Sequence, residues 1–160
     1  MSGYPLAPMI EVRTRREEAA AKEVRAAEAR YQEALAAERK AREDLEKYKA
    51  FKASEIERLW QALLGQKTST KGLDEFKESL AKLDRREADF ALKVEEAVAK
   101  VKKRLDEVEE ARQEYQARRR ALEKLQRHKE AYLAVEAAEA ERLEGLEMEE
   151  FTRLSVGPVE

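Results

Sequence analysis

The sequence has 160 residues and contains no cysteine, and no proline lies between Pro8 and Pro158. Without cysteine, neither a disulfide framework nor a thiolate metal site can form. Without internal proline, most of the chain is free to be helical, because proline breaks a helix interior. Before Ser155 the same interval holds three glycines, Gly65, Gly72 and Gly145.

Other absences narrow the classes of function. No apolar run approaches the ~18 residues of a membrane-spanning helix, and the N-terminus lacks the basic-then-apolar pattern of a signal peptide. His128 is the single histidine, so a multi-histidine metal site is excluded and a Ser-His-Asp triad would have to use it. Phosphate-binding glycine loops are also missing. We expect no enzyme, no cofactor and no metal, and a net charge of −2 gives no broad case for nucleic acid.

What fills the chain is mainly Ala, Glu, Lys, Arg, Leu and Gln, the residues that lose least on becoming helical. Charged residues make up 42% and aromatic residues 6%, a balance typical of long helices and coiled coils. Gly65 and Gly72 bracket the polar segment 66–71, where a continuous helix would stop. We therefore predict an all-α protein, a single long antiparallel two-helix coiled-coil hairpin.

The predicted bounds treat 1–160 as one unit: an extended leader at 1–8, helix 9–65, turn 66–72, helix 73–154 and tail 155–160. Folding about residue 69 places residue i opposite roughly 138 − i, by the equal rise of both helices. Met9 and Ile10 then face His128 and Lys129. The second helix is longer and overhangs the first from there to about Leu154.

Apolar residues recur in steps of three and four, which is the spacing of a coiled-coil seam. In the first helix the seam reads Val24, Ala27, Tyr31, Ala34, Glu38, Ala41, Leu45 and Tyr48, and continues through Lys52 to Ile56, Leu59 and Leu63. In the second it starts at Leu73, Phe76, Leu80 and Leu83 and thins toward Leu143 and Leu146. Two stutters, at Lys52 and at Ala97–Val101–Leu105, predict local unwinding of the supercoil.

Three features stand out from this repeat. Aromatic and apolar residues are concentrated at the predicted bend, where Phe51 and Trp60 lie one position off the seam. These residues either cap the hairpin by packing on one another or bind a partner, and both roles can hold. Segment 112–129 is basic and faces Arg13, Arg15 and Arg16, whereas 136–150 is acidic. A solvated face is the preferred interpretation, and a docking surface is the alternative. The apolar leader 4–10 either folds onto the second helix or docks elsewhere.

The N-terminal residues also carry a resemblance. Tyr4-Pro5-Leu6 with Pro8-Met9, then Val12-Arg13-Thr14-Arg15-Arg16-Glu17-Glu18-Ala19 opening a long antiparallel hairpin, resembles the FliJ/YscO/SctO stalk proteins of type III secretion. The version in chlamydial-type injectisomes begins very similarly. The specific part of this likeness is residues 4–19.

The resemblance implies a monomeric, non-enzymatic stalk in the cytoplasm, with no membrane span and no nucleic-acid partner. In that family the end with both termini enters the central hole of the hexameric secretion ATPase, the bend reaches the cytosolic domain of the export gate protein, and some members bind secretion chaperones. The implied ATPase-binding residues are Arg13, Arg15, Arg16, Arg118, Arg119, Arg120, Leu143 and Leu146. The implied export-gate-binding residues are Leu45, Tyr48, Trp60, Phe76, Leu80 and Leu83.

Two other hypotheses stay open behind the stalk. The first is a general coiled-coil scaffold or adaptor that dimerises through the exposed stripe. The second is a helical nucleic-acid-binding arm using Lys100, Lys102, Lys103, Arg104 and Arg118–Arg120, against which the interspersed glutamates argue.

Overall fold

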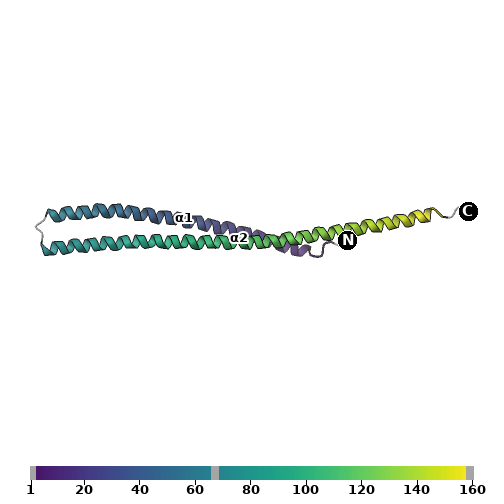
Figure 1. The fold of residues 1–160 in the computed structure, drawn as a ribbon, viewed down its shortest axis with the longest axis horizontal. Helices are drawn as coiled ribbons and strands as arrows, with labels where there is room; N and C mark the ends of the chain where they lie inside the picture. Colours follow the sequence, from purple (N-terminus) through teal and green to yellow (C-terminus); the bar gives the residue numbers. More distant parts are fainter. Residues whose placement is uncertain (1–2, 66–68, 158–160) are drawn as a thin grey trace. The chain divides into compact units, whose positions relative to one another are not determined.

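The computed structural model describes residues 3–65 and 69–157. It contains two helices, α1 (Ala7–Leu64, 58 residues) and α2 (Thr70–Ser155, 86 residues) (Figure 1). They pack antiparallel and α2 is the longer, which confirms the predicted all-α hairpin. The contacts divide the chain into two compact units. The bend unit is Val24–Ala111, and the terminal unit is Met1–Glu23 with Arg112–Glu160; each is described by itself.

Both helices begin earlier than the sequence predicts. Residues 4–6 form a turn rather than an extended leader, closed by the Ala7 N–H, which donates to the Tyr4 carbonyl over 3.1 Å. Pro8 then falls in the first turn of α1, where its missing N–H is not needed. At the start of α2, Ser69 Oγ accepts a hydrogen bond from the Gly72 N–H over 3.1 Å and so caps the helix. Residues 66–68 of the predicted turn lie outside the described residues.

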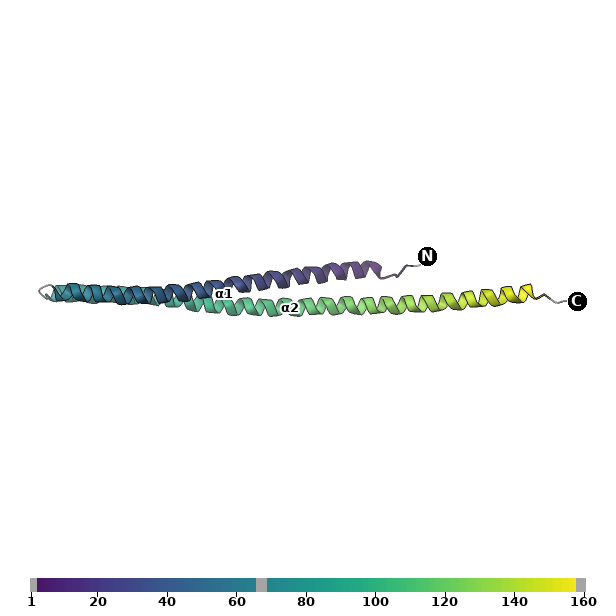
Figure 2. The ribbon, with the colours of Figure 1, turned by 90° about the horizontal axis from the view of Figure 1, so that it is seen from above.

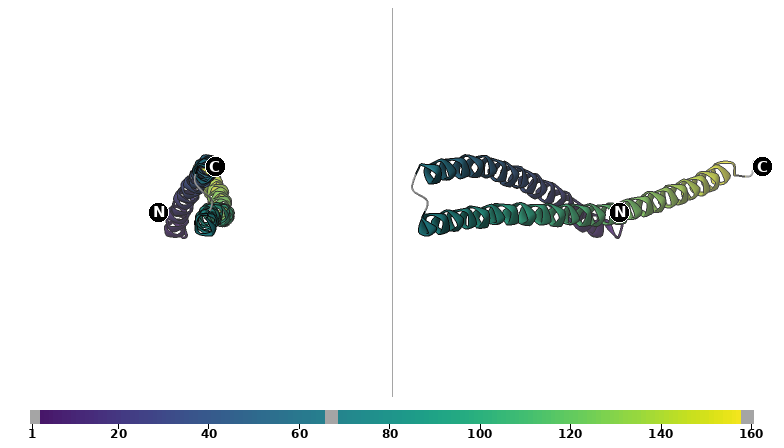
Figure 3. Two further views of the ribbon diagram at one scale, coloured as in Figure 1. Left: turned by 90° about the vertical axis from the view of Figure 1, so that its left-hand side faces the viewer. Right: turned by 60° about the vertical axis from the view of Figure 1, so that its left-hand side comes forward.

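In the bend unit the two helices lie side by side, which the right-hand view of Figure 3 shows for the end of α1 and the start of α2. Its most buried cluster is Ala27, Val108 and Ala111, with Val24 and Tyr31 packed against it. Small alanines at seam positions let the helix backbones approach closely, so the interior is a narrow stripe.

The pairing of the helices follows the predicted register. Tyr48, which is 7% exposed, stacks on Phe90 with ring centroids 4.8 Å apart and an interplanar angle of 24°. Phe90 is the residue that the rule of 138 − i places opposite Tyr48. The predicted seam therefore brings the expected residues together in this part of the bend unit.

One predicted stutter is wrong. Leu105 is 37% exposed, and Arg104 takes the seam position between Val101 and Val108. Arg104 Nη1 donates to Glu107 Oε2 over 2.9 Å. A long arginine stem can fill an apolar seam while its guanidinium stays paired at the edge, so steps of three and four continue without interruption.

In the terminal unit the buried side chains are Tyr4, Ala20, Leu122 and Leu125. Figures 1 and 2 show α2 running on past the first turn of α1. Every residue from Ala137 to Gly157 is exposed. The helix continues through Gly145 without a break. We call Ala137–Ser155 the tail of α2.

Candidate functional site and interaction surfaces

The six side chains predicted to bind the export gate fall into two kinds. Trp60 is 45% exposed and lies 5.9 Å from Phe76, measured between ring centroids. Tyr48 is buried, and Leu45, Phe76, Leu80 and Leu83 are half-buried in the seam. Trp60 therefore offers the largest accessible contact area, while the other five chiefly support the surface from below.

A groove runs beside these residues along the bend unit. Its volume is about 330 Å³, and its lining is Tyr48, Phe51, Glu55, Arg58, Leu59, Ser79, Lys82, Leu83 and Arg86. A second hollow of about 190 Å³ shares Leu59 and Ser79 with it and continues toward Leu63 and Gly72. Phe51 is 54% exposed at its edge. The predicted site residues left Phe51 out, although its place one position off the seam was the available signal.

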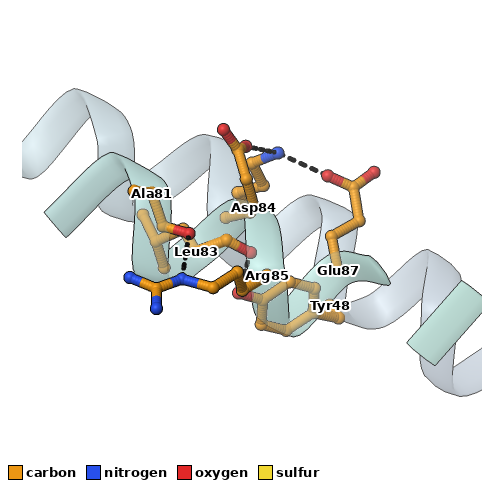
Figure 4. Close-up of polar contacts among 7 residues, drawn as sticks. Tyr48, Ala81, Leu83, Asp84, Arg85 and Glu87 are labelled. Carbon is orange, nitrogen blue, oxygen red and sulfur yellow. Dashed lines mark hydrogen bonds and ion pairs between the residues drawn. The ribbon is translucent and has the colours of Figure 1, made fainter. Parts of the chain in front are cut away.

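Lys52 occupies a seam position next to Phe51, which lines this groove. Its ammonium forms an ion pair with Asp84 at 2.6 Å and a second one with Glu87, and Figure 4 shows both carboxylates turned toward the same nitrogen. The hydrogen bonds that Lys52 donates to these two carboxylates raise its pKa, and the bond to Asp84 has the larger effect. The sequence placed Lys52 in the seam at the first stutter but did not predict its two partners.

The leader folds onto α2, which settles the alternative left open by the sequence. Tyr4 is 6% exposed, and its ring meets the edge of Tyr132 with centroids 5.3 Å apart. The Tyr4 hydroxyl is hydrogen-bonded to Nδ1 of His128. His128 is an exposed helix-surface residue, and its structural role is to hold the leader.

The six arginines predicted to bind the ATPase lie in the terminal unit, and four of them have partners within it. Arg13 Nη1 donates to the Ala121 carbonyl over 2.9 Å. The ion pairs are Arg15 with Glu11 at 3.5 Å, Arg118 with Glu114 at 2.7 Å and Arg119 with Glu123 at 3.0 Å. The hydrogen bond that Arg119 donates to Glu123 raises the pKa of Arg119. Arg16 and Arg120 are exposed and form no ion pair with any residue in 3–65 or 69–157.

The tail of α2 presents apolar side chains without a partner in the described parts of the chain. Leu143 and Leu146, both predicted to bind the ATPase, are 48% and 46% exposed. Further along, Met148, Phe151 and Leu154 are 67%, 71% and 82% exposed. These last three were not among the predicted site residues, because the seam pattern ends at Leu146.

Neither described range, 3–65 or 69–157, holds a group of three or more His, Cys, Asp or Glu side chains arranged to bind a metal ion. Within the same ranges, neither helix has a stretch apolar enough to cross a membrane.

The model of the family described as Type III secretion protein YscO matches residues 6–154. The chain belongs to the YscO family of type III secretion proteins. This confirms the resemblance seen in the leader and the first turns of α1. No curated protein sequence matches the chain.

Two solved structures share the YscO fold seen here. The crystal structure of type III secretion protein YscO from Vibrio parahaemolyticus has a TM-score of 0.83 and 24% identity, covering 91% of this chain and 92% of its own. The Chlamydia trachomatis protein CT670, described as a YscO homologue, has a TM-score of 0.79 and 23% identity, covering 96% and 94%. At these identities the likeness shows the fold alone.

Proposed function

We propose that this YscO family protein is a non-enzymatic central stalk that acts in the cytoplasm and links the hexameric secretion ATPase to the export gate. The observation that carries the proposal is the unequal length of the helices. α2 extends beyond the part of the terminal unit where α1 can cover it, and the tail displays exposed leucines that a monomer leaves in water. Exposed apolar side chains grouped on one segment are typical of a binding surface.

The terminal unit is the end that meets the ATPase in this proposal. Leu143 and Leu146 enter the central hole, where their apolar surface is removed from water. Arg13, Arg15, Arg16, Arg118, Arg119 and Arg120 contact the rim. Arg16 and Arg120 are the strongest candidates among the arginines, because their charges are not neutralised by an ion pair in the described residues.

The bend unit is the end that meets the cytosolic domain of the export gate protein. Trp60 is the anchor, since a half-exposed tryptophan gains the most from burial at an interface. Phe76 supports it from below, and Leu45, Tyr48, Leu80 and Leu83 complete the surface. Secretion chaperones are further partners within this proposal, and the chain acts as a monomer when bound to the ATPase.

The proposed binding to the ATPase is tested by a hydrolysis assay with the secretion ATPase of the same system. We expect the wild-type chain to stimulate hydrolysis and Leu143→Asp/Leu146→Asp to lose most of that stimulation. Leu92→Asp is the matched control, because Leu92 is equally exposed but lies in the bend unit. A wild-type chain that neither binds the ATPase nor changes its turnover would contradict the stalk function.

The proposed binding to the export gate is tested by titrating the isolated cytosolic domain of the gate protein against the chain. Trp60→Ala should weaken binding at least tenfold, as expected for an interface anchor. Leu92→Asp again serves as the control. If the gate domain bound the wild type and Trp60→Ala with equal affinity, Trp60 would not be part of the interface. That result would not contradict the proposed binding to the ATPase.

A further inference from the structure

The groove of the bend unit combines an apolar floor with free positive charge. Phe51 and Leu59 supply the apolar surface, and Ser79 on α2 is too small to fill the space between the helices. Lys82 and Arg86 stand at its α2 edge, four residues apart and therefore on the same side of the helix. We call this surface, lined by Phe51, Leu59, Ser79, Lys82 and Arg86, the basic groove.

The charges at the edges of the basic groove are not equally available. The Arg58 guanidinium is held by Glu55, with Nε of Arg58 donating over 3.0 Å. By contrast, Lys82 and Arg86 form no ion pair or hydrogen bond with any side chain among the described residues, and both are exposed. An occupant of this groove should therefore bring two carboxylates together with apolar side chains, which is the chemistry of an acidic amphipathic helix.

The tail of α2 is a segment with this composition. Glu147, Glu150, Phe151 and Leu154 follow the spacing i, i+3, i+4 and i+7, so they share one face of the helix. Phe151 and Leu154 are 71% and 82% exposed, and the two glutamates form no ion pair within 3–65 or 69–157. One face of the tail thus carries two free carboxylates and two large apolar side chains.

The spacing of the charges also agrees. Lys82 and Arg86 are separated by about 6 Å along α2, and Glu147 and Glu150 by about 4.5 Å, from the rise of an α-helix. Long basic side chains adjust over a difference of this size. The two hollows that share Leu59 and Ser79 extend the groove along α1 from Tyr48 to Leu63, about 22 Å by the same rise, which accommodates the two turns from Glu147 to Leu154.

We propose that the basic groove of one copy binds the tail of α2 from a second copy. Phe151 and Leu154 cover Phe51 and Leu59, while Glu147 and Glu150 pair with Arg86 and Lys82. This self-contact goes beyond the proposed stalk function, since it covers the tail of one copy and the surface next to Trp60 of the other. The copy whose tail is held is unavailable to the ATPase, and the copy whose groove is filled is unavailable to the export gate. The contact is therefore a resting state from which assembly releases the protein.

The contact is small, and its ion pairs are exposed. Interfaces of this size are weak and transient, and exposed ion pairs are screened by salt. We therefore expect self-association that rises with protein concentration and weakens as salt is added.

Sedimentation velocity of the full chain over a concentration series, at low and high salt, tests the proposal. Lys82→Glu/Arg86→Glu should weaken self-association about tenfold or more, through loss of two ion pairs and added repulsion. Glu147→Lys/Glu150→Lys should do the same. Lys100→Glu/Lys102→Glu, which reverses two exposed charges elsewhere in the bend unit, is the matched control and should leave self-association unchanged.

Mixing the two charge-reversed variants is the decisive step. Each alone has a groove and a tail of the same sign, whereas the mixture again offers opposite signs and should associate. Helicity by circular dichroism checks that every variant is folded, which is expected because all six substituted positions are exposed. A chain that is monomeric throughout, or a mixture that does not associate, overturns the proposal. Loss of gate binding by Lys82→Glu/Arg86→Glu in a chain that stays monomeric would assign the groove to a partner protein instead.

Discussion

The hydroxyl of Tyr48 on α1 donates a hydrogen bond to the main-chain carbonyl oxygen of Leu83 on α2, over 2.8 Å. The same ring stacks on Phe90, so a single side chain joins the helices by both a polar and an apolar contact. Figure 4 shows the Tyr48 ring lying beside Leu83.

Removing the Tyr48 hydroxyl separates these two contributions. Tyr48→Phe keeps the stacked ring and should lower the free energy of unfolding by about 1 kcal/mol, the usual net value of a hydrogen bond. Tyr48→Ala should lower it by about 3–5 kcal/mol, because a large buried side chain is lost. Urea unfolding measures both. Tyr31→Phe is the matched control, since the Tyr31 ring packs on the core. An equal loss for Tyr31→Phe and Tyr48→Phe would contradict the assigned role of the Tyr48–Leu83 bond.

The two carboxylates that hold Lys52 predict a dependence on alkaline pH. The pKa of Lys52 is raised by Asp84 and Glu87, so the folded chain binds this proton more tightly than the unfolded chain does. Its contribution is therefore fully present below the unfolded pKa of about 10.4 and is lost as pH rises through the higher folded value. We expect the difference in Tm between wild type and Lys52→Met to be constant up to about pH 10 and to shrink above it. The exposed Lys49 gives the control variant Lys49→Met, whose difference should stay small throughout.

Glu107 predicts the opposite dependence, on the acid side. The hydrogen bond from Arg104 lowers the pKa of Glu107, and Arg30 adds to the effect through a contact of 3.9 Å. A carboxyl whose folded pKa is depressed stabilises the fold above its unfolded pKa, near 4.3, and loses that contribution as pH falls through the folded value. Glu107→Gln should therefore be less stable than wild type at pH 7, and the difference should shrink as pH falls below about 4. A gap between the two Tm values that does not change with pH would show that the side chain acts through packing rather than charge.

The leader gives a local prediction. Tyr4→Ala removes the side chain that packs on Tyr132 and bonds to His128, so the first turns of α1 lose their anchor. Hydrogen exchange should accelerate at the amides of residues 7–14 while the bend unit keeps its protection. Tyr4→Phe retains the ring and should show a much smaller acceleration. Uniform acceleration over both units would mean that the leader stabilises the whole fold.

Gly145 lies within α2, and a Cβ added there meets no atom within 4 Å. Gly145→Ala should therefore favour the local helix by about 1 kcal/mol, through helix propensity alone. Slower hydrogen exchange in the tail is the expected readout, with no change in the unfolding midpoint of the bend unit. Gly3→Ala, at a position with equally open surroundings outside both helices, should leave tail exchange unaltered.

Much of the fold could be read from local signals. Heptad spacing predicted which residues face each other, as Tyr48 and Phe90 show. Gly65 directly follows the last residue of α1, whereas Gly72 lies within α2. Arg104 was misplaced because residue type alone does not show that an arginine stem can replace Leu105 in a seam. The Ser69 cap was missed for a similar reason, since a serine inside a polar loop gives little indication of its hydrogen bond.

The interaction surfaces were less predictable. The exposure of Trp60 follows from its position off the seam. The shape of the groove beside it depends on small neighbours such as Ser79. Its charge depends on which basic side chains are already paired, as Arg58 is with Glu55. The docking of Tyr4 on His128 joins residues that are far apart in the sequence, and no local pattern encodes it. The family was predictable because residues 4–19 carry a specific motif.

Every residue of the tail of α2 is exposed, and no other described part of the chain covers it. An isolated helix of about 20 residues sits near the midpoint between order and coil in water, because nucleation is costly and nothing else rewards it. A binding partner therefore has to stabilise the helical state of the tail. Because part of the helix forms on binding, the affinity of the tail for its partner should fall more steeply with temperature than the affinity of a rigid helix would.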